Sequence, residues 1–180
     1  MNRYLLRIET SNPSLYANFH PDSNFKEREK CLKTLALEGY QVGTGVLIGL
    51  PGQTPYDLAR DVCYYSKIGA HMLGMGPYVP AEGTPLAAHY SRTQVEKDLH
   101  TESLFETAMR MVAVTRLAKP RANISATTAM EVLDPNGRVR ALRAGANVVM
   151  PVLTPVEEKV KYQLYKGKTE VKSGLDVLRS

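Results

Sequence analysis

The segment YQVGTGVLIGLPGQTPYDLARDVCYYSKIG, residues 40–69, contains a complete strand, turn and helix. Its first part is a short apolar run that ends in the glycine and proline turn GLPGQT, which is typical of a buried strand. Its second part begins with Thr54 as a helix N-cap and Pro55 in the first helical position, and it ends at Gly69. A buried strand followed directly by a helix predicts a parallel α/β sheet.

The same alternation of strands and helices continues on both sides of this segment. We expect further strands at 4–9, 70–80, 122–129 and 146–152, and further helices at 24–39, 100–119 and 135–145. A closed (β/α)8 barrel typically needs about 250 residues and eight strands. Roughly five βα units therefore predict either an open five-stranded sheet or the back part of a barrel.

Composition limits the classes of function. The 180 residues are 43% hydrophobic and 23% charged, which predicts one globular domain. The N-terminal residues lack a signal-peptide pattern, and no apolar run could span a membrane, so we expect a cytoplasmic protein without membrane contacts. The net charge of +5 is spread along the chain and predicts a solvated surface rather than a nucleic-acid site. Two distant cysteines and four scattered histidines show no metal-ligand spacing.

The first strand carries an unusual pair of charges in YLLRIETSNPSLY, residues 4–16. Because side chains alternate along a strand, Arg7 and Glu9 share one face, while Leu6 and Ile8 share the other. The pair either belongs to a polar surface strand or lines a ligand site. Ligands of parallel α/β proteins bind at the carboxyl ends of strands, where this pair is expected.

Other polar residues are expected at the same edge. Arg28 lies on the apolar stripe of its helix, so its guanidinium either reaches over the sheet to an anion or carboxylate, or extends to water. Thr127 and Thr128 follow a strand and could hold a small anion. Gly43 and Gly45 inside a strand indicate close approach to the backbone. The GLPGQT turn lacks the lysine of a P-loop, which argues against a nucleotide phosphate site.

Seven motifs in order resemble the HydE family of radical S-adenosylmethionine (SAM) enzymes, which mature [FeFe]-hydrogenase, and more distantly PylB and biotin synthase. They are YLLRIETSNPSLY, GVLIGLPGQT, GMGPYVPAEGTPLA, MVAVTRL, ISATTAM, GANVVMP and YQLYKGK. The resemblance implies the C-terminal part of a radical SAM (β/α)8 TIM-type barrel. We further expect a partial barrel with its C-terminal capping segment at residues 1–168, and a disordered tail at 169–180.

The resemblance also implies site residues and cofactors. By position, three residues match the SAM site of the family: Glu9 would bind the amino group of SAM, Arg28 would bind its carboxylate, and Met72 would line the site. Those matched to the substrate cavity are Arg7, Thr127, Thr128, Met150 and Tyr165. The family uses SAM with a [4Fe-4S] cluster, acts on a small-molecule or organometallic substrate, and cooperates with other hydrogenase maturases.

One departure from the family pattern limits these expectations. The family's Cys-x-x-x-Cys-x-x-Cys cluster motif does not occur in the sequence, so we expect no catalytic or metal-ligating residue in this chain. The expected function is that of a HydE-like fragment, without the N-terminal strands and the cluster loop, that is not competent alone. The alternatives are a noncatalytic half-barrel that dimerises or docks on a partner, a PylB-like or biotin-synthase-like activity, and an unrelated α/β enzyme that binds an anion.

Overall fold

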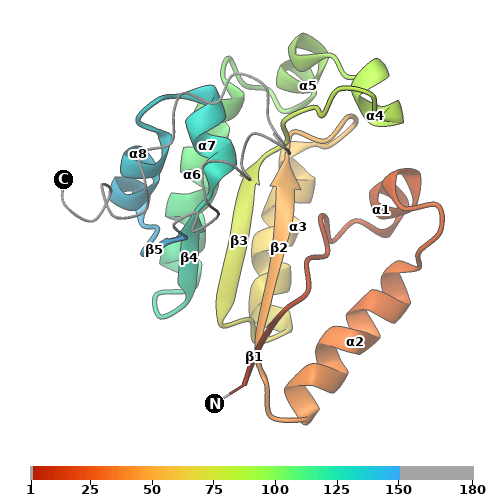
Figure 1. The fold of residues 1–180 in the computed structure, drawn as a ribbon, viewed down its shortest axis with the longest axis vertical. Helices are drawn as coiled ribbons and strands as arrows, with labels where there is room; N and C mark the ends of the chain where they lie inside the picture. Colours follow the sequence, from red (N-terminus) through yellow and green to blue (C-terminus); the bar gives the residue numbers. More distant parts are fainter. Residues whose placement is uncertain (1, 151–180) are drawn as a thin grey trace, which may run out of the picture.

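The computed structural model describes residues 2–150, which form a single sheet of five parallel strands (Figure 1). The strands are β1 (Arg3–Leu5), β2 (Gln41–Ile48), β3 (Met72–Pro77), β4 (Asn123–Ala126) and β5 (Val148–Val149). Each strand pairs with the next one in the sequence, so the sheet order is β1-β2-β3-β4-β5. Consecutive parallel strands joined by helices are the arrangement of a TIM-type barrel, of which these strands form a part.

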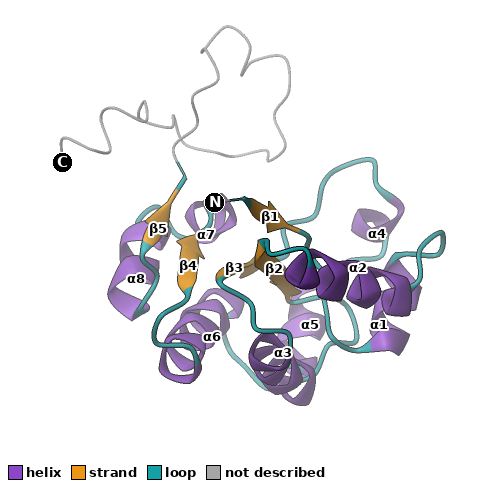
Figure 2. Ribbon diagram, turned by 90° about the horizontal axis from the view of Figure 1, so that it is seen from below, coloured by secondary structure: helices purple, strands orange, loops and turns teal. Residues whose placement is uncertain are grey.

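Four helices of eight or more residues connect the strands and cover one side of the sheet. They are α2 (Phe25–Leu37), α3 (Pro55–Lys67), α6 (Leu104–Ala118) and α8 (Gly137–Ala144). Figure 2 shows the strands along an arc, with these helices outside it. The shorter helices are α1 (Pro13–Phe19), α4 (Pro85–Ala88), α5 (Arg92–Asp98) and α7 (Thr128–Leu133). Helices α1, α4 and α5 lie near the end to which the arrows of β2 and β3 point (Figure 1).

The apolar core lies between the sheet and the outer helices. Its fully buried members include Ile8, Val46, Leu73 and Ile124 from the strand segments. The opposite, inner face of β2 and β3 is rich in glycine. Gly45 of β2 is the register partner of Gly74 of β3, and Leu47 of β2 is the partner of Gly76. Large side chains therefore pack outward, while the inner face of these two strands leaves room for other groups.

The prediction of a partial barrel is confirmed, but three local expectations were incomplete. The expected helices do not include α1, which Asn12 caps, with Pro13 at its start. The polar stretch at 87–101 contains the whole of the short helix α5 and the second half of α4. Helix α7 begins directly after Thr127. The predicted boundary at residue 168, the predicted tail and Tyr165 lie outside the described residues.

Candidate functional site at the carboxyl edge of the sheet

Arg7 and Glu9 form a bidentate ion pair just beyond β1. Arg7 Nε donates to Glu9 Oε1 at 3.0 Å, and Arg7 Nη2 donates to Glu9 Oε2 at 3.0 Å. The two side chains are partly exposed, at 31% and 21%. The paired nitrogens fix the plane of the carboxylate, because a guanidinium matches a carboxylate with two parallel hydrogen bonds. The predicted placement of both charges on one side of the strand segment is confirmed.

Arg7 lies flat across the inner face of the neighbouring strands. Its Nη2 donates to the carbonyl oxygen of Val46 at 2.8 Å, and its Nη1 donates to that of Gly74 at 3.2 Å. Added Cβ atoms at Gly45 and Gly74 would each lie 3.2 Å from Arg7 Nη1. Because these two glycines have no side chains, the guanidinium can lie against the backbone of both strands. This is the close approach to the backbone that Gly45 within the strand predicted.

Glu9 has an unusual backbone conformation, with φ of +59°, in the left-handed region that L-residues rarely adopt. The amides of Ile8 and Glu9 both donate to the carbonyl of Gly45, at 3.1 and 3.0 Å. The carbonyl of Glu9 then accepts from the Leu47 amide at 2.9 Å. Because two residues here oppose one on the neighbouring strand, the local pleat is broken as in a bulge. Tertiary contacts therefore set the direction of the carboxylate.

A cavity of about 230 Å³ lies beside Glu9. Its wall is largely apolar and aromatic, and it comes from the ends of β1 and β2 and from α1 and α4. The lining residues are Glu9, Thr10, Tyr16, Phe19, His20, Leu47, Leu50 and Leu86. Tyr16 and His20 stack with ring centroids 4.5 Å apart. A carboxylate in an apolar wall of this kind attracts a cationic group, because the low local dielectric strengthens the interaction.

Arg28 reaches this edge from the first turn of α2, but its partner is a backbone group. Its Nη1 donates to the carbonyl oxygen of Arg7 at 2.9 Å, and its guanidinium carbon lies 5.9 Å from the centre of the Tyr16 ring. The sequence left open whether the Arg28 guanidinium reaches over the sheet or extends to water. The observed placement agrees with the first alternative. The guanidinium is thereby held next to the segment that carries Glu9.

The remaining predicted residues lie at different places on the sheet. Thr127 Oγ1 donates to the carbonyl of Met75 at 3.4 Å, and a Cβ at Gly76 would lie 2.5 Å from this hydroxyl oxygen. Thr127 therefore borders the inner face near Gly76, and Thr128 opens α7. Met72 is in register with Gly43 and lies at the start of β3, away from its carboxyl end. Met150 is the last described residue and is half exposed.

Two aspartates on α3, which sequence reasoning did not select as site residues, hold the segment after Glu9. Asp57 Oδ1 accepts from Asn12 Nδ2 at 2.8 Å, and Asp61 Oδ1 accepts from the Ser11 amide at 2.6 Å. Burial works against the ionised form of Asp57, but hydrogen bonds from Thr54 and Asn12 hold its pKa below the usual value. Burial raises the pKa of Asp61 to about 7, against the opposing hydrogen bond from the Ser11 amide. The signal in the sequence was an aspartate on the helix stripe of Leu58, Asp61, Val62 and Tyr65, which is buried throughout.

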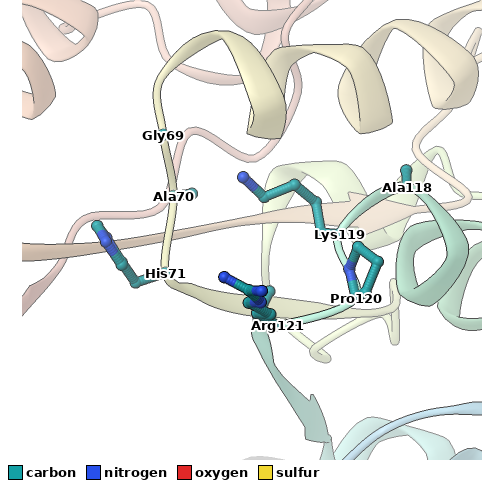
Figure 3. A pocket seen from close by; sticks show the side chains of 8 residues that line it. Gly69, Ala70, His71, Ala118, Lys119, Pro120 and Arg121 are labelled. Atoms are coloured by element: carbon teal, nitrogen blue, oxygen red, sulfur yellow. The ribbon is translucent and has the colours of Figure 1, made fainter.

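A second cavity, of about 300 Å³, lies at the opposite edge of the sheet. Figure 3 shows its lining, which includes Gly69, His71, Lys119 and Arg121. These residues precede β3 and β4, so the cavity opens at the amino ends of the strands. Because ligands of parallel α/β folds bind at the carboxyl ends, the smaller cavity beside Glu9 is the better candidate despite its size.

Neither a cluster of metal-ligating side chains nor a helix able to cross a membrane occurs in the described part of the chain. Within residues 2–150, no group of three or more His, Cys, Asp or Glu side chains is placed to hold a metal ion. Cys31 on α2 and Cys63 on α3 are both exposed, free thiols. Among the described helices, none combines the length and hydropathy that crossing a bilayer requires.

Comparison with known proteins identifies relatives along nearly the whole chain. The [FeFe] hydrogenase maturase subunit HydE of Thermotoga maritima is 44% identical over 167 residues, which are 93% of this chain and 45% of that protein. The 3-methylornithine synthase of Methanosarcina acetivorans is 28% identical over 89% of this chain and 41% of its own length. A biotin synthase of Prochlorococcus marinus is 26% identical over 83% of this chain and 41% of its own length. No family model matches the sequence.

A solved structure supports the fold. The crystal structure of methylornithine synthase (PylB) superimposes with a TM-score of 0.77 and 24% sequence identity, over 99% of this chain and 49% of that one. The resemblance to HydE that the seven motifs predicted is confirmed by the 44% sequence identity. The chain is a HydE-like sequence, related also to 3-methylornithine and biotin synthases, and it spans less than half the length of these relatives.

Proposed function

We propose that this chain supplies the SAM-binding edge and part of the substrate cavity of a HydE-like radical SAM enzyme. The observation that carries the proposal is the Glu9 carboxylate, oriented by Arg7 and bordering an apolar cavity, with Arg28 anchored next to it. The amino acid end of SAM carries an ammonium and a carboxylate. A carboxylate and a guanidinium are the complementary partners for these two groups.

In this proposal each residue has a separate task. Glu9 accepts hydrogen bonds from the SAM ammonium, and Arg7 keeps the carboxylate in place, since its Nη1 and Nη2 also bond to backbone carbonyls. Arg28 takes the SAM carboxylate. The cavity beside Glu9 is smaller than the roughly 300–1,000 Å³ of pockets that enclose a whole ligand, so it suits one end of a larger molecule.

The substrate residues are part of the same proposal. Thr127 and Thr128, with Met150 and Tyr165, would line the substrate cavity. Met72 is not part of this proposal, because it lies at the amino end of β3, away from Glu9. The substrate is a small or organometallic molecule, and the partners are other hydrogenase maturases in the cytoplasm. Identity favours HydE-like chemistry over PylB-like or biotin-synthase-like chemistry, at 44% against 28% and 26%.

The chain's own residues do not fit a [4Fe-4S] cluster. The family motif has three thiolates in one loop, whereas this sequence contains two cysteines, which lie on separate helices and are exposed. No chemical step through a cluster is therefore assigned to this chain. Its proposed contribution is to bind and orient the amino acid end of SAM and to exclude water from one side of the cavity.

The test uses a chimera in which the part of Thermotoga maritima HydE that precedes the matched region is fused to this whole chain. Equilibrium dialysis would measure the SAM dissociation constant. A lost charge-assisted hydrogen bond is worth about 1.5–3 kcal/mol, so we expect Glu9→Gln to weaken binding about 10- to 100-fold. The matched control is Glu29→Gln, which removes a carboxylate that pairs with Lys33 and Lys67 on the outer helices. Equal affinities of the two variants would contradict the proposal.

A noncatalytic module is the second candidate, and the free edge of β1 favours it. Among the described strands, β1 pairs with β2 alone, and its Tyr4 and Leu5 are 49% and 45% exposed. An unpaired strand edge with apolar side chains is a template for association. Light scattering coupled to size-exclusion chromatography would show a dimer that Leu5→Lys dissociates if this candidate is correct. A monomer that gains SAM binding only in the chimera would favour the enzyme fragment.

A further inference from the structure

A buried carboxylate on α3 contacts the segment that follows Glu9. Asp61 is 0% exposed, and its Oδ1 accepts from the Ser11 amide at 2.6 Å. The neighbouring Asp57 has a local task, because it completes the capping box of α3 with Thr54. Asp61 lies in the second turn of the helix, where its carboxylate serves no cap. Its hydrogen bond from the Ser11 amide joins two segments that lie 50 residues apart in the sequence.

Stability alone does not explain this carboxylate. Its Oδ2, the Ser11 hydroxyl and the Tyr65 hydroxyl are all buried and have no hydrogen-bond partner among the described residues. Burying such groups unpaired costs free energy, and an apolar side chain in the middle of a helix stripe would avoid that cost. Burial also raises the pKa of Asp61 to about 7, which shows how unfavourable the ionised form is there. We therefore expect Asp61 to have a role other than packing in the core.

The geometry indicates that task. Ser11 lies two residues after Glu9, and the Thr10 amide between them donates to the Ile8 carbonyl at 2.7 Å. The strained Glu9 backbone is thus held on one side by its bonds with Gly45 and Leu47, and on the other by the Asp61 contact. Tyr65 lies one turn after Asp61, and its pKa is raised by burial and is also affected by the charges of Arg7 and Glu9. The buried face of α3 therefore lies next to the ion pair.

We propose that Asp61 is a positioning residue: by binding the Ser11 amide, its carboxylate holds Glu9 in the left-handed conformation that directs the Glu9 side chain to Arg7 and the cavity. The consequence for SAM binding rests on the proposed function. The consequence for the conformation of Glu9 does not. Asp61 itself touches no ligand in this proposal, because it is fully buried on the outer side of the strand end.

The first experiment uses nuclear magnetic resonance on the whole chain, labelled with 13C and 15N. The variants are Asp61→Leu, which removes the acceptor, and Asp61→Asn, which keeps one. The control is Val62→Ala, which removes apolar packing from the same face of α3 and changes no polar group. The readouts are the Glu9 Cα chemical shift, which reports a left-handed backbone, and the exchange rate of the Ser11 amide relative to that of Val46.

Asp61→Leu should move the Glu9 shift and accelerate Ser11 exchange at least tenfold relative to Val46. Asp61→Asn should restore both, and Val62→Ala should leave both near wild-type values. An unchanged Glu9 shift in Asp61→Leu, or the same selective change in Val62→Ala, would overturn the proposal. If Asp61→Leu does not fold, the wild-type chain decides: the Ser11 amide proton must shift downfield and titrate together with the Asp61 carboxyl carbon, and independent behaviour overturns the contact.

The second experiment separates this proposal from the proposed function. In the chimera with HydE, Asp61→Leu should weaken SAM binding at least tenfold, and Asp61→Asn should recover most of the affinity. A chimera that binds SAM equally well with and without Asp61 overturns the positioning role. A wild-type chimera that does not bind SAM refutes the proposed function instead, and the resonance experiment then decides the role of Asp61 by itself.

Discussion

Replacement of Glu9 by glycine and by alanine tests whether its left-handed backbone is strained. Both variants lose the carboxylate and its bonds to Arg7, so they differ only in the Cβ atom. An L-residue in the left-handed region costs about 1–2 kcal/mol, whereas glycine adopts it freely but loses about 0.5–1 kcal/mol of additional chain entropy on folding. At φ of +59°, Glu9→Gly should therefore be more stable than Glu9→Ala by about 1 kcal/mol.

The measurement is thermal and urea unfolding followed by circular dichroism. For a chain of this size, 1 kcal/mol corresponds to a difference in Tm of about 2–4 °C. The matched control is Ala59→Gly, at an exposed position inside α3. There the same loss of a Cβ atom should lower stability by about 1 kcal/mol. The sign of the alanine-to-glycine difference should thus reverse between position 9 and position 59.

One result would refute the reasoning. If the glycine variant at position 9 is no more stable than the alanine variant, while Ala59→Gly shows its expected loss, the left-handed conformation is not a strained feature of the folded chain. The argument that tertiary contacts hold the Glu9 carboxylate in place would then fail with it.

The remaining predictions concern the sheet and the buried carboxylate. A Cβ at Gly45 would lie 2.0 Å from the carbonyl oxygen of Gly74, so Gly45→Ala should abolish folding, as judged by circular dichroism. A Cβ at Gly74 has no contact shorter than 3.2 Å, and that contact is with a side-chain atom, Arg7 Nη1, so Gly74→Ala should remain folded with a lower Tm. Because burial raises the pKa of Asp61 to about 7, its folded form keeps a proton that the unfolded chain loses near pH 4. The free energy of unfolding of the wild type should therefore fall relative to that of Asp61→Asn as pH rises from about 4 to 7, by at most about 1.4 kcal/mol per pH unit, and the difference should stay constant above pH 7. Urea unfolding of both proteins across this pH range measures the slope, and the charges of Asp57 and Arg60 are common to both. Parallel curves of stability against pH would contradict the prediction.

Local patterns in the sequence were sufficient for the alternation of strands and helices. Thr54, Pro55 and Asp57 encode the start of α3 through a capping box and a fixed proline φ, which act within four residues. Gly39 and Gly69 have positive φ at the helix ends, as the sequence predicted. The ion pair of Arg7 and Glu9 was also predictable, because alternation along a strand acts over two residues. Helix α1 was missed, although Asn12 and Pro13 carry a standard start signal, since the motif was interpreted only as the end of a strand.

Contacts between distant segments decided the rest. The bond from Arg7 to the Gly74 carbonyl joins segments 67 residues apart, and the bond from Arg28 to the Arg7 carbonyl joins segments 21 residues apart. The left-handed conformation of Glu9 accompanies the bonds of this segment to β2. The Asp61 contact with Ser11 spans 50 residues, and a helix stripe alone does not tell whether an aspartate on it meets solvent or a backbone amide. The sequence by itself thus determined the order of elements and the residue types at the strand ends, since these depend on local periodicity. Only the tertiary structure decided which of these residues meet and how Glu9 is oriented, because strand register and helix packing bring together groups that no local pattern relates.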